Sequence, residues 1–203
     1  ASRPTPELVS AIRRVIVNPA WTVPRSIATA DLLAKQQQDN GYLKRNNIRV
    51  YRVTNGAASE IPSTSINWDA LNIDNFPYQL KQAPGPSNSL GQIKFDFANA
   101  DDVFLHDTPG KSLLELSFRS LSSGCVRLSE AEPLAEWILV GNNVGNNKNA
   151  LGQALNDSQF KTVSLRVAPE IPIEIVYILA WISEDDGTVQ FRDDIYDTLG
   201  SPD

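Results

Sequence analysis

Two short stretches near the middle of the chain, Leu105-His-Asp-Thr-Pro109 and Ser122-Ser-Gly-Cys-Val-Arg127, contain its single histidine and its single cysteine. His106 ends a short apolar run that favours a strand, and Cys125 follows a Ser-Ser-Gly turn. Strand ends and the loops after them are where folds usually present catalytic groups. An imidazole within reach of a thiol activates a cysteine nucleophile, so these two residues are the candidate catalytic groups.

The residues beside Cys125 fit the same chemistry. Gly124 allows the backbone to bend closely, so that amide N–H groups can point at an oxyanion. Arg127 shares a face with Cys125 in an extended segment, where its guanidinium would favour the thiolate or hold a substrate carboxylate. A structural interpretation stays open, because a lone cysteine is commonly a small buried hydrophobe and a lone histidine a satisfied polar group. For Arg127, a surface salt bridge is an equal alternative.

The composition of the 203 residues narrows the classes of function. There are 18 basic and 24 acidic side chains, a net charge of −6, which disfavours binding to a nucleic-acid backbone. No apolar run approaches the roughly 18–20 residues that a membrane span needs. A single cysteine excludes an internal disulfide framework and a cysteine-rich zinc site, and a single histidine excludes a multi-histidine metal site. For nucleophilic chemistry at neutral pH, the sequence therefore offers few candidates for the base.

The residues before the two stretches predict helices, a strand and a loop-rich unit. Apolar residues at positions 8, 9, 12, 15 and 16 have helical spacing and predict a helix over 6–17, which Asn18-Pro19 ends. A second helix is predicted over 29–38 and a strand over 47–54. From 55 to 90 the sequence is rich in Pro, Ser, Asn and Gly with apolar residues between them, which indicates a loop-rich subdomain packed on other structure.

The remainder of the chain predicts mainly β structure with one well-signalled helix. Ser129 and Glu132 form a capping box, which predicts that a helix begins after Ser129. A short helix is also predicted over 150–156, and Asp186-Gly187 supplies a hairpin turn. Strand patterning is found over 93–97, 103–106, 162–167, 173–182 (which should be buried) and 189–195. The predicted class is mixed and β-rich.

The two central stretches, with Cys125 placed 19 residues after His106, resemble the L,D-transpeptidase (YkuD-type) catalytic domain. More narrowly, the chain resembles the large periplasmic YcbB-type branch of Gram-negative bacteria. Four further strings carry that likeness: Asn18-Pro-Ala-Trp-Thr-Val-Pro24, Gln82-Ala-Pro-Gly85, Leu90-Gly-Gln-Ile-Lys-Phe95 and Phe191-Arg-Asp-Asp-Ile-Tyr196. The resemblance covers nearly the whole chain.

The resemblance implies an α+β, β-rich fold, a YkuD-type β-sandwich catalytic domain with an inserted loop-rich capping subdomain. Residues 1–17 would be part of the catalytic domain, 18–88 the capping (lid) subdomain, and 89–203 the catalytic core. Family domains begin with strands that should precede Ala1, so we expect the chain to begin inside the domain. Aromatic residues of the lid such as Trp68 and Phe76 face either its own core or a ligand, and local core is the more common case.

The chemistry that the resemblance implies is cysteine acyl transfer on peptidoglycan. Cys125 would attack the bond between diaminopimelate and the terminal D-alanine of a tetrapeptide stem, and His106 would take the thiol proton. The thioester would pass to a side-chain amine of a second stem, giving a 3→3 cross-link. We expect the amides of Gly124 and Cys125 to form the oxyanion hole, with Ser123 as a positioning residue.

The resemblance also implies the remaining partners and the location. Arg127 and Phe104 would contact substrate, no cofactor or metal is needed, and carbapenems would acylate the thiol. The expected location is the periplasm, with a membrane anchor only in a segment N-terminal to this chain. Two positions depart from the family pattern. Ser123 stands where many members have a second histidine, and Phe104 stands where the YcbB-type branch is expected to have tyrosine.

Other functions remain open beside cross-linking. Within the family, the same site would trim stem peptides as an L,D-carboxypeptidase or attach an envelope protein, since only the acceptor differs. From another class, the chain would be a non-catalytic peptidoglycan-binding module, although such a module has no need of a thiol in this setting. Sortases also use Cys, His and Arg, but their histidine lies much farther ahead of the cysteine.

Overall fold

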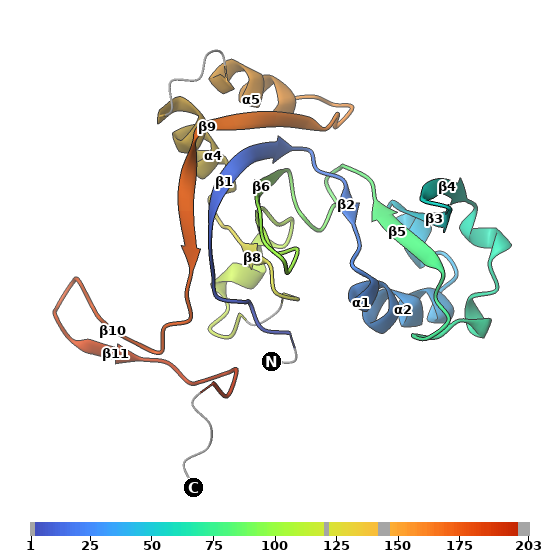
Figure 1. The fold of residues 1–203 in the computed structure, drawn as a ribbon, viewed down its shortest axis with the longest axis horizontal. Helices are drawn as coiled ribbons and strands as arrows, with labels where there is room; N and C mark the ends of the chain where they lie inside the picture. The colour runs from blue at the N-terminus through green and yellow to red at the C-terminus, as the bar shows by residue number, and fades with distance from the viewer. Residues whose placement is uncertain (1–2, 120–121, 142–146, 199–203) are drawn as a thin grey trace, which may run out of the picture.

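The computed structural model describes residues 3–119, 122–141 and 147–198. Its main body is a five-stranded sheet in the order β8-β7-β6-β1-β9, in which β7 and β8 are parallel and the other neighbours antiparallel. Helices α4 and α5 cover one face of this sheet (Figure 1). The bounds of these elements are β1 Leu8–Val17, β6 Ile93–Phe97, β7 Leu105–His106, β8 Val126–Arg127, β9 Val163–Ile175, α4 Ala131–Gly141 and α5 Asn147–Leu155.

Strand alternation builds the core between the sheet and the two helices. Side chains at alternate positions of β1 and β6, such as Val15 and Phe95, are 0% exposed and face the helices. Helix α4 begins close after Ser129, as predicted, and presents Ile138 and Leu139 to the sheet, while α5 adds Leu151. The intervening residues of each strand lie on the opposite face, which we call the open face.

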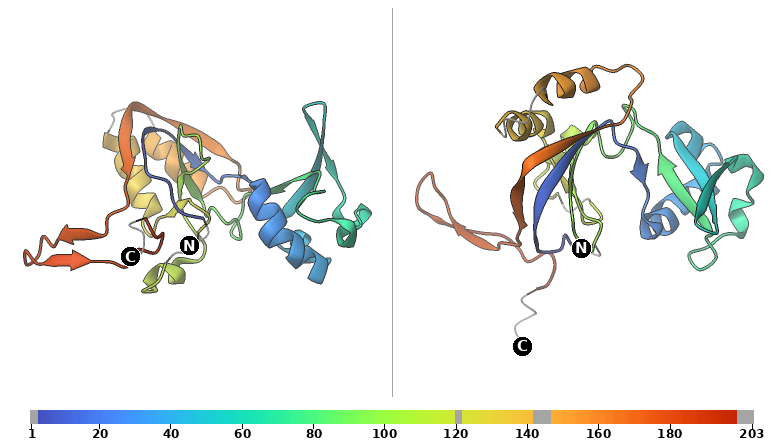
Figure 2. Two further views of the ribbon diagram at one scale, coloured as in Figure 1. Left: turned by 60° about the horizontal axis from the view of Figure 1, so that its bottom comes forward. Right: turned by 45° about the horizontal axis from the view of Figure 1, so that its top comes forward.

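A second lobe contains a four-stranded antiparallel sheet in the order β2-β5-β3-β4. It has its own core, in which Trp68, Phe76 and Leu80 are buried together, so the local-core interpretation of these aromatics is correct. Figures 1 and 2 show the lobe beside the five-stranded sheet. Its elements are β2 Trp21–Thr22, α1 Arg25–Ile27, a π-helical turn η1 Ala28–Leu32, α2 Leu33–Gln38, α3 Tyr42–Arg45, β3 Ile48–Thr54, β4 Ala57–Ile61, η2 Ser63–Ser65, η3 Trp68–Ala70 and β5 Tyr78–Gln82.

The predicted mixed, β-rich class is confirmed, and so are several individual elements. Strands 47–54 and 93–97 correspond to β3 and β6, and the predicted helix over 29–38 corresponds to η1 and α2. The Asp186-Gly187 turn joins β10, Ala180–Ile182, to β11, Val189–Phe191, as predicted. This hairpin extends away from the five-stranded sheet (Figure 1). Among the described residues, no helix is long and apolar enough to cross a membrane.

The predicted helix over 6–17 is wrong, because this segment is the strand β1. The register of β1 shifts between Ile12 and Arg14 against both neighbouring strands. Against β6, Arg13 is the extra residue of a bulge, whereas against β9 the extra residues, 167–170, lie on β9. The bulge places Ile12 and Val15, three positions apart, on the same buried face. An apolar spacing of three in a bulged strand imitates the helical period, and this caused the error.

Two further predictions are corrected by the structure. The predicted strand 162–167 and the start of 173–182 belong to one long strand, β9, which ends at Ile175, and the end of 173–182 is the separate strand β10. Val176 and Ile178 between them are exposed rather than buried. The region 55–90 contains two strands, β4 and β5, in addition to its loops. Strand β4 is exposed at every residue except Ile61, and it therefore lacks the alternating pattern by which a half-buried strand is recognised.

Candidate active site

The structure places His106 and Cys125 on neighbouring parallel strands. His106 pairs with Arg127 in the register of β7 and β8, and Cys125 directly precedes β8. Side chains two residues apart along a strand share a face, so Cys125, Arg127 and His106 all lie on the open face. Thiol and imidazole make no direct hydrogen bond in the described part of the chain, so proton transfer between them requires a closer approach.

His106 is held by its own strand and is 5% exposed. Its Nδ1 atom donates to the main-chain carbonyl of Asp107, which leaves Nε2 as the unprotonated nitrogen of the ring. A backbone carbonyl therefore orients the imidazole. Burial lowers the pKa of His106, and the hydrogen bond to the Asp107 carbonyl opposes this only in part. The neutral imidazole that results at pH 7 is the form that accepts a proton.

The side chain of Asp107 points away from the imidazole and fixes the backbone on either side. Its Oδ2 atom accepts from the amide of Gln92 at 2.9 Å, and its Oδ1 atom pairs with Lys111 Nζ at 2.6 Å. Gly91 adopts a φ of 62°, and a Cβ there would overlap the Asp107 carboxylate. The Leu90–Phe95 string is thus physically needed to seat the strand of His106.

Cys125 is half-buried, and burial raises the pKa of its thiol. The positive charges of Lys94 and Arg127 act in the opposite direction but do not outweigh burial. Arg127 therefore favours the thiolate as expected, yet the thiol remains protonated at neutral pH. Attack by Cys125 consequently depends on a base, and His106 is the neutral base on the same face.

A cavity of about 240 Å³ opens beside Cys125. Leu113 and Leu114 line it from the 3₁₀ turn η4, Lys111–Glu115, and Arg119 and Arg127 supply two positive charges. Thr5, close to the N-terminus in sequence, and Tyr196, close to the C-terminus, also line this cavity. A hollow with apolar walls and guanidinium groups suits a peptide that ends in a carboxylate.

Gly124 and Ser123 shape the loop before the thiol. Gly124 has a φ of 112°, a conformation that other residues rarely adopt, so glycine is required there by the backbone. Ser123 Oγ accepts a hydrogen bond from Arg3 Nη1 at 2.7 Å. Arg3 also binds both carboxylate oxygens of Asp31, at 2.9 and 3.0 Å, and Asp31 belongs to the η1 turn of the second lobe.

Sequence reasoning missed Arg3, because its contacts join positions 28 and 120 residues apart and leave no local pattern. It also missed Lys94, which pairs with His106 across β6 and β7. Lys94 Nζ lies 4.1 Å from the centre of the Phe104 ring and 3.3 Å from Asp96 Oδ1, and the Phe104 and His106 rings are 5.8 Å apart. Apolar and charged residues alternate along 93–97, and this pattern could have placed Lys94 on the face of the sheet opposite to the core.

The structure therefore brings together all six residues singled out from the sequence: Phe104, His106, Ser123, Gly124, Cys125 and Arg127. In residues 3–119, 122–141 and 147–198, no three His, Cys, Asp or Glu side chains are grouped so as to hold a metal ion. The site consists of a protonated thiol, a neutral imidazole and several cations, which is an arrangement for acyl transfer.

Comparison with known proteins gives an independent result. The model of the YkuD family, the L,D-transpeptidase catalytic domain, matches residues 1–145. A protein of Haemophilus influenzae named "Putative L,D-transpeptidase" is 33% identical over 195 residues. The match covers 96% of this chain and 38% of that relative, so the chain spans well under half of the relative's length.

Proposed function

The chain belongs to the YkuD family of L,D-transpeptidase catalytic domains, and we propose that it cross-links peptidoglycan through a thioester on Cys125. The observation that carries this proposal is the combination of a protonated thiol with a neutral, carbonyl-oriented imidazole on one sheet face. The donor is a tetrapeptide stem, cleaved between diaminopimelate and D-alanine. The acceptor is the side-chain amine of a second stem, which gives a 3→3 cross-link.

In the first half-reaction, His106 Nε2 takes the proton of the Cys125 thiol as Sγ attacks the donor carbonyl carbon. The amides of Gly124 and Cys125 receive the oxyanion, with the loop held by Ser123. When the tetrahedral intermediate collapses, the carbon–nitrogen bond breaks and imidazolium returns the proton to the leaving D-alanine amine. The product is a thioester, and the imidazole is neutral again.

In the second half-reaction, the acceptor amine attacks the thioester carbon and loses a proton to His106. The carbon–sulfur bond then breaks, and imidazolium reprotonates the departing thiolate. Because burial raises the thiol pKa, the free thiolate is a costly species, and coupling each proton transfer to bond formation avoids it. Lys94 and Arg127 stabilise the negative charge that develops on sulfur.

The cations of the cavity give a reason for donor selectivity. Arg127 and Arg119 line the space beside Sγ, where the carboxylate of the terminal D-alanine would lie. Phe104 packs against His106 and supplies an apolar wall for the stem. These two arginines would also bind the carboxylate of a carbapenem, whose ring carbonyl acylates the same thiol.

Residues 18–88 are proposed to act as the lid of this site. Support comes from Arg3, which connects Asp31 of the second lobe to Ser123 of the thiol loop. A lid that excludes water would protect the thioester from hydrolysis. Because the proposed substrate is cell-wall peptide, we place the protein in the periplasm.

Three other functions are outcomes of the test. If water replaces the amine, the site is an L,D-carboxypeptidase, and if an envelope protein supplies the amine, it is an attaching enzyme. A non-catalytic peptidoglycan-binding module would bind stems without forming a thioester.

The decisive experiment is intact mass spectrometry of the folded protein. The protein is incubated with a tetrapeptide stem or a carbapenem, with and without an acceptor stem, beside Cys125→Ala as control. The proposal predicts an adduct on the wild-type protein alone, release of D-alanine, and a 3→3 dimer when acceptor is added. Release of D-alanine without a dimer would indicate hydrolysis, and a folded protein that forms no adduct would exclude the thioester.

A further inference from the structure

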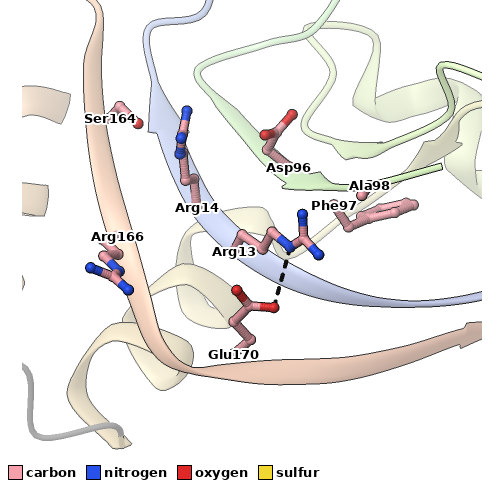
Figure 3. Close-up of a pocket in the computed structure, with 8 residues that line it drawn as sticks. All are labelled: Arg13, Arg14, Asp96, Phe97, Ala98, Ser164, Arg166 and Glu170. Atoms are coloured by element: carbon pink, nitrogen blue, oxygen red, sulfur yellow. Dashed lines mark hydrogen bonds and ion pairs between the residues drawn. The ribbon is translucent and has the colours of Figure 1, made fainter.

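A second cavity, of about 500 Å³, lies on the open face of the five-stranded sheet and is not used by the steps above. Arg13 and Arg14 of β1 and Arg166 of β9 line it, together with Asp96 and Glu170 (Figure 3). All three guanidinium groups are exposed. In a chain of net charge −6, such a local cluster of cations would attract an anion that the rest of the surface repels.

The β-bulge creates this cluster. In a regular strand Arg13 and Arg14 would face opposite sides, but the bulge between Ile12 and Arg14 brings both to the cavity. Arg13 is neutralised by Glu170, 3.2 Å from its Nε, as the dashed line in Figure 3 marks. Asp96 is paired with Lys94.

Arg14 and Arg166, in contrast, form no ion pair with any described residue. They stand directly opposite one another in the register of β1 and β9, an arrangement of like charges that destabilises a sheet. In the part of the chain that the structure describes, neither side chain has a hydrogen bond or an ion pair. Two neighbouring guanidinium groups without ion pairs therefore line a cavity. Guanidinium groups bind carboxylates in a bidentate manner, so this arrangement suits a carboxylate ligand.

The same two residues are aligned with the thiol. Arg14 pairs with Asp96 on one side and with Arg166 on the other. Extending the strand registers of β6, β7 and β8 by one residue places Phe104 beside Asp96 and Cys125 beside Phe104. A single cross-strand row therefore runs from Cys125 to Arg166. At about 4.8 Å per strand, Arg14 lies about 14 Å and Arg166 about 19 Å from Cys125.

We propose that Arg14 and Arg166 bind carboxylates of the acceptor stem peptide while its side-chain amine reaches the thioester. This inference rests on the proposed function and names the acceptor subsite of that reaction. The acceptor amine stands at the end of the long diaminopimelate side chain. Its main-chain carboxylates are displaced from the thioester by that side chain plus one or two residues of about 3.5 Å each, a reach comparable with the distance to Arg14.

Donor and acceptor thus use different arginines. The donor carboxylate belongs beside Sγ, near Arg119 and Arg127, whereas the acceptor extends along the row over Phe104 and Asp96 towards Arg14. The donor site lies at the β8 edge of the sheet, whereas Arg14 on β1 and Arg166 on β9 are three and four strands away from that edge. This separation would let the acceptor bind while the donor remains attached to Cys125.

The test measures binding in the absence of chemistry, so its failure is separate from failure of the thioester experiment. Cys125→Ala protein is titrated calorimetrically with a tripeptide stem that ends at diaminopimelate and so has no D-alanine to release. Combining Arg14→Gln with Arg166→Gln is expected to weaken binding by about tenfold or more, because two charge-assisted hydrogen-bond sites are lost. Substitution of both residues by lysine should restore part of the affinity.

Two controls sharpen the result. Arg49→Gln, on a strand of the second lobe, should leave the affinity unchanged, and thermal melts should show that the Arg14 and Arg166 variants are folded. A tripeptide whose carboxylates are carboxamides should bind weakly and respond little to the substitutions. The proposal would be overturned if the double variant bound the tripeptide with unaltered affinity, or if the amidated peptide bound as tightly as the carboxylate form. It would equally be overturned if inorganic phosphate bound more tightly than the tripeptide, or if the protein with Arg14 and Arg166 intact showed no measurable binding.

Discussion

The two faces of the five-stranded sheet are made by the same strands and have different physical roles. On the covered face, Val15 and Phe95 are 0% exposed and pack against α4 and α5. On the open face, the neighbouring residues Arg14, Lys94 and Asp96 are charged and at least partly exposed. One residue along a strand thus separates a group that stabilises the fold from a group available for chemistry.

This difference follows from the period of two in a strand. The covered face can tolerate only apolar groups, because a charge there would be buried without a partner. The open face carries charges at little cost in free energy. His106 on β7 and Cys125, directly before β8, lie at the far edge of this face. The comparison predicts that open-face substitutions alter rate more than stability, and that covered-face substitutions do the reverse.

The largest effect should come from His106 on the open face. His106→Ala is expected to slow acylation of Cys125 by about 10²–10⁴-fold, the usual contribution of a general base. His106→Asn serves as a second variant, since its amide nitrogen, bonded to Cγ as Nδ1 is, can still donate to the Asp107 carbonyl and so preserve the buried hydrogen bond. The rate of adduct formation with a carbapenem measures both. An unchanged rate in a folded variant would remove His106 from its role as base.

On the covered face, Phe95→Ala should lower the free energy of unfolding by about 3–5 kcal/mol, because it leaves a cavity in the core. Denaturant unfolding measures this loss, and the folded fraction should still acylate at close to the wild-type rate. Lys94, its neighbour in sequence, provides the matched comparison: Lys94→Gln should slow acylation while changing stability by less than about 1 kcal/mol. A variant pair with the opposite behaviour would refute the division of roles.

The pH dependence of acylation gives a finer test of the open face. Burial lowers the pKa of His106 below its ordinary value of 6.5, so the imidazole stays unprotonated, and the rate stays constant, as pH falls through 6.5. Below the lowered pKa of His106 in the folded protein, the rate should fall about tenfold per pH unit. Folding stability should also be full above the ordinary value and decrease as pH falls towards the folded pKa. An acid limb centred above pH 6.5 would contradict this environment for His106.

Much of the catalytic region could be predicted from sequence because its signals are local. The capping box at Ser129, the alternation over residues 93–97 and the strings that contain His106 and Cys125 each depend on neighbouring residues. The helix wrongly predicted over 6–17 failed for a physical reason, since the bulge at Arg13 converts the strand period into a helical spacing. The same bulge brings Arg13 and Arg14 to the arginine cavity, so the segment that was wrongly predicted as a helix is also the one that contributes to the proposed acceptor subsite.

Contacts between distant segments could not be predicted. The opposition of Arg14 and Arg166 depends on the register of two strands about 150 positions apart, and no composition or motif encodes that register. The contact of Arg3 with Asp31 and Ser123 likewise exists only after the two lobes have folded.

The smallest expected effect lies where the open face meets the second lobe. Arg3→Ala should lower the midpoint of thermal unfolding by less than about 4 °C, because an exposed ion pair contributes below about 1 kcal/mol. The side chains of Arg3 and Asp31 are 31% and 39% exposed, which limits the energy of their contact. Acylation should nevertheless slow by up to about tenfold, because Ser123 loses the donor that holds the thiol loop.

Arg49→Ala is the matched control for Arg3→Ala. It breaks an ion pair of 3.2 Å with Glu60 inside the second lobe, between side chains that are 58% and 50% exposed. Both variants should lose similarly little stability, but only Arg3→Ala should slow the acylation of Cys125. Equal acylation rates in the two variants would show that the Arg3 contact has no role in acylation and is an ordinary surface ion pair. A selective loss would instead show that the second lobe acts on the open face through Ser123, as a lid of this site requires.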